Sequence, residues 1–155
     1  MKKNKFLTVL VIGLMGGLCV SGFAVYVWFM PHRDVVSTEP DYQLSSSSFI
    51  SEYLEDAGAS NNKYLSDDGD SKIVVLSGLV SSISQNQNGD QVVLMKERGS
   101  LVGVAFTFAT ETNGDATVLK PGQYIAIKGV VRAGPRRDEF LGLYSNGVIE
   151  KASIF

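Results

Sequence analysis

The sequence has little of the side-chain chemistry that most enzymes use. Of its 155 residues one is a cysteine, Cys19, and one is a histidine, His32. A single cysteine excludes an intrachain disulfide and a cysteine-based metal site. No Gly-x-Ser-x-Gly motif is present, and no candidate nucleophile has an evident general base. We therefore expect a protein that is not an enzyme, although two carboxylates could still converge in space.

Charge is absent from one long segment near the N-terminus. Residues 6–30 form a run of 25 residues without a charged side chain. As a helix the run would be about 37 Å long, enough to cross a hydrocarbon core of roughly 30 Å. Three lysines precede it and one arginine, Arg33, follows it at once. The excess of positive charge before the run predicts a single-pass membrane protein with residues 1–5 in the cytoplasm. The domain after the run would lie outside the cytoplasm, in the periplasm if the cell has an outer membrane.

A cleaved signal peptide is the alternative interpretation of the same run. Its apolar region would be roughly 7–15 residues and would end in a small-x-small motif. Gly22, Phe23 and Ala24 fit that motif loosely, but apolar residues continue to Met30. We therefore favour an uncleaved anchor.

Positive charge is scarce in the part that follows the anchor. It holds 11 of the 14 Lys and Arg residues and all 16 Asp and Glu residues, which gives a formal charge of −5. General binding of phosphate backbones needs a basic stripe. The composition therefore makes nucleic acid an unlikely partner.

Two segments precede the first predicted strand. Residues 31–47 are polar and rich in turn-forming types, so we predict a linker between anchor and domain. Phe49, Tyr53 and Ala57 recur at helical spacing, which predicts one short amphipathic helix over 48–60 at the start of a domain spanning 48–155. Residues 66–71 hold three aspartates, but their spacing does not match a calcium-binding loop. We therefore predict a solvated turn, no metal site and no cofactor.

From Lys72 the pattern changes to that of strands. Residues rich in β-branched types alternate with turn signals such as Asn88-Gly89. One long first strand and four others suggest a small barrel, in which Gly78 and Gly129 would relieve sharp bends. The five strands are predicted at 72–84, 91–97, 101–109, 124–132 and 140–152.

Several segments together resemble one known family. They read MPHRDV, NNKYL, IVVLSGLVSSIS and VLKPGQYIAIKGVV along the chain. They look like the bacterial proteins of the tRNA-anticodon-like (tRNA_anti-like) family, which combine an N-terminal hydrophobic segment with one OB-type barrel. The resemblance covers roughly residues 30–150 and implies an all-β, five-stranded OB fold. It implies no activity, and no functional residue is carried over from it.

Candidate ligand-binding residues follow from the places where OB folds bind ligands, the face of strands 2 and 3 and the 1–2 and 4–5 loops. Phe106 and Phe108 share a face with the valines of their strand, so we expect both inside the barrel. Alternation in the fourth strand leaves Tyr124 and Lys128 as exposed candidates. The following loop adds the densest basic cluster of the domain, which could hold a carboxylate, a phosphate or a lipid headgroup. Its members are Arg132, Arg136 and Arg137.

These observations favour a membrane-anchored, non-enzymatic OB-fold binding module. The expected partners are the membrane, through residues 6–30, and an envelope protein, a peptide or a glycan. Binding would use the barrel face and the loops at 85–90 and 132–139. The alternative is a protein that binds single-stranded nucleic acid.

Overall fold

The computed structural model describes residues 34–67 and 70–155, and the predicted membrane span at 6–30 lies outside this part. Within the described residues, no helix is long and apolar enough to cross a bilayer. The transmembrane helix therefore stays a prediction. Residues 34–155 form one compact unit of the chain.

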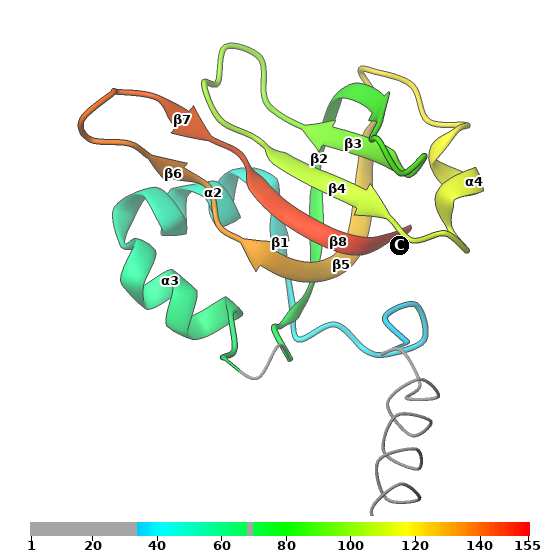
Figure 1. Ribbon diagram of the computed structural model, residues 1–155, viewed down its shortest axis with the longest axis horizontal. Helices are drawn as coiled ribbons and strands as arrows, with labels where there is room; N and C mark the ends of the chain where they lie inside the picture. Colours follow the sequence, from blue (N-terminus) through cyan, green and yellow to red (C-terminus); the bar gives the residue numbers. More distant parts are fainter. Residues whose placement is uncertain (1–33, 68–69) are drawn as a thin grey trace, which may run out of the picture. The chain divides into compact units, whose positions relative to one another are not determined.

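Five strands close into a barrel, in which each strand pairs with two neighbours (Figure 1). The order β2-β3-β4-β8-β5 is closed by the pairing of β5 with β2. β4 and β8 run parallel, and the other neighbours in the barrel run antiparallel. The all-β class and the five-stranded OB-type barrel are confirmed. The strands are β2 (Ile73–Gln85), β3 (Gln91–Met95), β4 (Val104–Phe108), β5 (Tyr124–Ala133) and β8 (Gly147–Ile154).

The long strand β2 changes partner just after Gly78. Up to Leu79 it pairs with β5, and from Val80 onward it pairs with β3, with an irregular register after Val80. A Cβ atom at Gly78 would overlap the side chain of Ser46, so a larger residue does not fit there. The structure thus agrees with the predicted role of Gly78 in the long first strand. Gly129 also lies at a register irregularity, in the pairing of β5 with β8.

The barrel interior is filled by alternate residues of the strands. Val104, Phe106 and Phe108 of β4 are buried in the main core, as their alternation predicts. Gly103, just before β4, is buried as well, and a Cβ atom there would collide with the carbonyl of Met95.

Two helices cap one side of the barrel where we predicted a single helix over 48–60. They are α2 (Ser46–Glu55) and α3 (Ala57–Tyr64). Asp56 lies between them in an extended conformation, and its carboxylate accepts a 2.9 Å hydrogen bond from the backbone of Ala59. This N-cap starts a new helix, so Ala57, expected on the buried face, is exposed.

The residues before α2 are folded onto the barrel. β1 (Tyr42–Ser45) adds a parallel strand to the first half of β2. Ahead of it, Val35 is buried against Ile73 and Val130 in a small cluster of their own. Residues 34–47 therefore differ from the free linker that their polar composition suggested.

The connection between β5 and β8 contains a separate two-stranded hairpin. It is formed by β6 (Arg136–Arg137) and β7 (Tyr144–Ser145), whereas we predicted one strand over 140–152. The Asn146 side chain accepts a 2.9 Å hydrogen bond from Gly103 N–H, which ties the end of the hairpin to the β3–β4 loop. β8 begins at the next residue. The connection between β4 and β5 holds one short helix, α4 (Asn113–Ala116).

Candidate functional site

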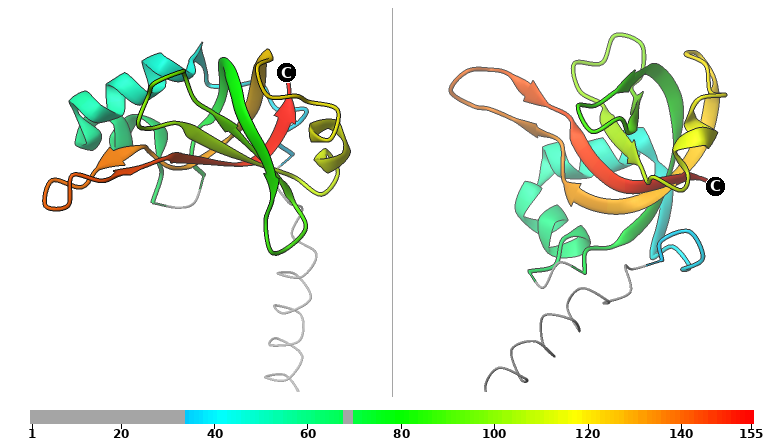
Figure 2. Two further views of the ribbon diagram at one scale, coloured as in Figure 1. Left: turned by 90° about the horizontal axis from the view of Figure 1, so that it is seen from above. Right: turned by 45° about the vertical axis from the view of Figure 1, so that its right-hand side comes forward.

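The β6–β7 hairpin projects from the barrel as a narrow ribbon (Figure 2). Asp138 organises the loop at its end. The Asp138 N–H donates to the carbonyl of Leu143 at 2.7 Å, and the Asp138 carbonyl accepts from Gly142 at 2.8 Å. The Asp138 carboxylate accepts from the N–H groups of Phe140 and Leu141, both at 2.9 Å. Gly142 has φ +65°, a conformation that favours glycine and lets the loop close.

This loop presents three large apolar side chains to solvent, Phe140, Leu141 and Leu143, here called the apolar tip. Their side chains are 100%, 70% and 63% exposed. Single exposed apolar residues are common, but a cluster at the end of a projecting loop marks an interaction surface.

Two exposed arginines lie at the base of the hairpin, on β6. The guanidinium carbon of Arg137 lies 5.8 Å from the ring centroid of Tyr144 on β7, a cation–π arrangement. Arg136 is exposed as well. The hairpin thus combines an apolar end with a cationic and aromatic base.

A buried tyrosine packs against the start of the hairpin. The ring of Tyr53 on α2 lies so close to Gly134 that a Cβ at this position would overlap it. Tyr53 in turn packs against Phe49 and Tyr64, with ring centroids 5.0 and 5.9 Å away. The base of the hairpin is therefore fixed to the helical cap.

The predicted basic cluster is divided in the structure. Arg132 lies on β5, where its Nε donates a 2.9 Å hydrogen bond to the carboxylate of Glu150 on β8. Arg136 and Arg137 lie on the hairpin instead. Of the three predicted residues, these two remain available for an anionic group.

Of the two candidates on β5, Tyr124 is exposed as predicted, but Lys128 is buried. Lys128 is 5% exposed, and its Nζ donates a 2.8 Å hydrogen bond to the carbonyl of Val36. The alternation placed Lys128 correctly on the outer side of β5, but residues 34–40 cover that side. The expectation of an exposed lysine is therefore wrong.

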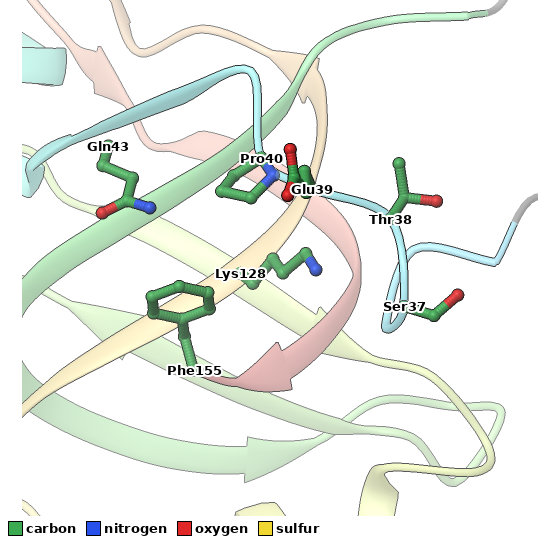
Figure 3. A pocket seen from close by; sticks show the side chains of 7 residues that line it. All are labelled: Ser37, Thr38, Glu39, Pro40, Gln43, Lys128 and Phe155. Atoms are coloured by element: carbon green, nitrogen blue, oxygen red, sulfur yellow. The ribbon is translucent and has the colours of Figure 1, made fainter.

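Beside Lys128 a pocket of about 380 Å³ opens between the N-terminal segment and the end of β8 (Figure 3). One N–H group of the Lys128 ammonium donates to a backbone carbonyl, and the carboxylate of Glu39 also lines the pocket. Its lining is Ser37, Thr38, Glu39, Pro40, Gln43, Lys128 and Phe155.

The outer face of β3 and β4 corresponds to the surface where OB folds commonly bind ligands. Its side chains are aliphatic or small and half-buried, with Val92 and Leu94 on β3 and Ala105 and Thr107 on β4. Neither strand places an aromatic ring outward. This face therefore lacks the stacking platforms that single-stranded nucleic acids use.

The profile of the tRNA_anti-like family matches residues 1–137. The chain belongs to the tRNA_anti-like family. The family resemblance read from the sequence is thereby confirmed.

Among solved structures, this family member is similar to a crystal structure from Klebsiella pneumoniae subsp. pneumoniae MGH 78578. That protein is described as a "putative nucleic acid-binding lipoprotein". The TM-score is 0.52 and the sequence identity 17%, over 81% of this chain and 99% of the other. A similarity at this identity supports the OB fold alone. A search of curated proteins gave no match.

The sequence pattern does not predict the apolar tip of this tRNA_anti-like protein, because Phe140, Leu141 and Leu143 read as the start of a strand. Asn146-Gly147, a common turn dipeptide, and Gly142 were the local signals that could have separated the tip from β8.

No metal centre stands out beside the hairpin. Within 34–67 and 70–155, no group of three or more His, Cys, Asp or Glu side chains is arranged to hold an ion. Two residues of the predicted solvated turn at 66–71 lie outside the described residues. The absence of a metal and of a cofactor stays a prediction.

Proposed function

We propose that the chain is a single-pass membrane protein whose OB-fold domain lies outside the cytoplasm and binds a partner there without catalysing a reaction. The uncharged run at 6–30 and the lysines before it support the anchor and its orientation. The similar Klebsiella protein is called a lipoprotein, which is consistent with an envelope location.

The choice of partner depends on the chemical character of the barrel surface. The β3–β4 face lacks outward aromatic rings. Residues 34–155 hold ten of the 14 Lys and Arg residues and all 16 Asp and Glu residues, a formal charge of −6. A surface of this kind suits an envelope protein, a peptide or a glycan better than a polyphosphate chain.

Membrane topology is the experiment that tests this proposal first. A reporter enzyme that is active on only one side of the membrane would be fused after Phe155 in the full-length chain. We expect activity on the extracytoplasmic side and retention of the fusion in the membrane fraction. Activity only in the cytoplasm would overturn the proposed orientation, and a soluble fusion would overturn the anchor.

Binding of single-stranded nucleic acid is the second candidate. The description of the Klebsiella protein as nucleic acid-binding favours it, and so does the use of OB folds for oligonucleotides. The probe is a labelled single-stranded deoxythymidine oligomer, titrated with the full-length chain in detergent at low and at moderate salt. The second candidate expects an affinity that falls steeply with salt. We expect no binding at either salt concentration.

A further inference from the structure

We propose that the β6–β7 hairpin inserts its apolar tip into the outer part of the bilayer to which the chain is anchored. The inference rests on the proposed function, because that anchor brings the bilayer within reach of the domain. It gives the domain a second attachment point to the membrane besides the anchor.

Four backbone N–H groups of the tip loop already have hydrogen-bond acceptors. Unpaired N–H groups are costly in lipid, because no water is there to bind them. The N–H groups of Asp138, Phe140, Leu141 and Gly142 are all paired within the loop. Asp138 accepts three of these four bonds, so the acceptors belong to the loop itself.

The base of the hairpin has the composition of a membrane interface. Tyrosine rings settle at the headgroup level, and arginine pairs with phosphate in a bidentate manner. Arg137 and Tyr144 form a cation–π pair across the hairpin, and the exposed Arg136 precedes Arg137 on β6. If the apolar tip enters the acyl region by roughly 5–10 Å, these groups lie behind it at the headgroups.

The charges beside the tip decide which lipid the hairpin prefers. Asp138 and Glu139 follow directly after Arg136 and Arg137, so this stretch has no net charge. Attraction to anionic lipids needs an excess of basic residues. The hairpin therefore favours insertion driven by apolar contact, which zwitterionic lipid supports as well as anionic lipid.

The hairpin and the N-terminal segment at 34–40 lie at opposite ends of the domain in each view (Figures 1 and 2). The anchor joins the domain through that segment. A tether raises the effective concentration of the second site, so even a weak contact is populated. Attachment at both ends would restrict rotation of the domain and fix which side of the barrel faces away from the membrane.

Lipid quenching of tryptophan fluorescence tests the inference on the full-length chain. Trp28, the single tryptophan of the sequence, is first replaced by Phe, and Phe140→Trp then places a probe at the tip. The matched control is Val118→Trp, because Val118 is 69% exposed and lies outside the hairpin, two residues after α4. Neither position is packed in the core. Both proteins are reconstituted into phosphatidylcholine vesicles with and without brominated phosphatidylcholine.

We expect brominated lipid to remove roughly half of the fluorescence at position 140 and little at position 118. Flotation of the vesicles after an alkaline wash tests the anchor separately. A chain that floats but shows no quenching at 140 would overturn the inference and leave the anchor intact, which would direct the tip to a protein pocket instead. Equal quenching at both positions would also overturn it. So would quenching at position 140 that appears only when phosphatidylglycerol is added to the vesicles. A chain that does not float would overturn both proposals.

Discussion

The ammonium group of Lys128 donates a 2.8 Å hydrogen bond to the carbonyl oxygen of Val36, a residue 92 positions earlier in the chain. The bond holds the N-terminal segment against the outer side of β5. Beside it, Val35 is buried with Ile73 and Val130. The segment that leads from the predicted anchor is thus part of the folded domain, and the domain does not hang on a free stalk.

Lys128→Met should loosen this segment. Methionine keeps much of the buried stem but cannot donate to Val36, and one lost hydrogen bond costs about 0.5–1.5 kcal/mol. We expect faster amide hydrogen exchange in residues 34–40, measured by mass spectrometry, and a loss of stability to urea of about that size. Lys120→Met, an exposed lysine in another loop, is the control. Unchanged exchange in 34–40 would show that Val35 alone holds the segment.

Lys128 also shows what strand periodicity can and cannot predict. Alternation along β5 gave the correct side of the barrel for Lys128, and alternation along β4 gave the correct side for Phe106 and Phe108. Periodicity reports the two faces of a strand but not what covers them. The cover over Lys128 comes from a polar segment that no local pattern connects with β5.

Gly134→Ala should destabilise the domain, because the added methyl group would overlap the ring of Tyr53. Overpacking of this kind costs about 1–3 kcal/mol. Thermal unfolding measures the effect, with Gly114→Ala as the control, because a Cβ at Gly114 meets nothing within 4 Å. A control variant as stable as the native chain and a Gly134→Ala variant with a lowered Tm are expected. Equal Tm values would mean that the α2 ring moves aside without cost.

Tyr53→Phe and Tyr64→Phe should differ in their effect on the stability of the domain, although both remove a buried phenol oxygen. The hydroxyl of Tyr53 is buried without a hydrogen-bond partner in the part of the chain that the structure describes. That of Tyr64 donates a 2.8 Å hydrogen bond to Glu52. Urea unfolding should show Tyr53→Phe equal to or more stable than the native chain, and Tyr64→Phe less stable by about 1 kcal/mol.

Tyr53→Phe should also change how the stability of the domain responds to high pH. Burial raises the pKa of Tyr53 to about 12 from 10.0, so the unfolded chain loses this proton first. The stability that depends on the protonated Tyr53 is complete below about pH 10 and is lost as the pH rises toward about 12. Tyr53→Phe should therefore show a shallower loss of stability over this window. An identical alkaline profile would mean that Tyr53 titrates normally in the folded chain.

The hairpin shows a second limit of prediction from sequence patterns. The closing of the barrel was predicted from β-branched runs and turn signals, which are local. The stretch from Phe140 to Tyr144 is as apolar as a strand, and only its position beyond Gly134 and before Asn146 separates it from β8. The separation depends on the bond between Asn146 and Gly103, which joins two loops 43 residues apart.

Glu52 should contribute stability that acid removes. Hydrogen bonds from Lys63 and then from Tyr64 lower the pKa of Glu52 below its ordinary value of 4.5. The contribution is therefore present above about pH 4.5 and is lost as the pH falls through the lowered pKa. Because Glu52 and Lys63 are both partly exposed, we expect less than about 1 kcal/mol. In urea unfolding between pH 6 and pH 3, Glu52→Gln should show a flatter profile than the native chain, and Glu55→Gln, on the same helix, should not.

Asp138→Ala should disorder the tip without unfolding the barrel. The change leaves the N–H groups of Phe140 and Leu141 without their shared acceptor. We expect their amide exchange to rise by about tenfold, which corresponds to about 1.4 kcal/mol, while Tm stays nearly constant because the tip packs against no core residue. Asp138→Asn is the control, since its amide oxygen can still accept both bonds. In the vesicle assay, Asp138→Ala should also weaken the quenching of tryptophan at position 140, because two unpaired donors oppose entry into lipid. Quenching that persists at full strength would show that apolar side chains alone determine insertion and that the order of the loop is irrelevant to it.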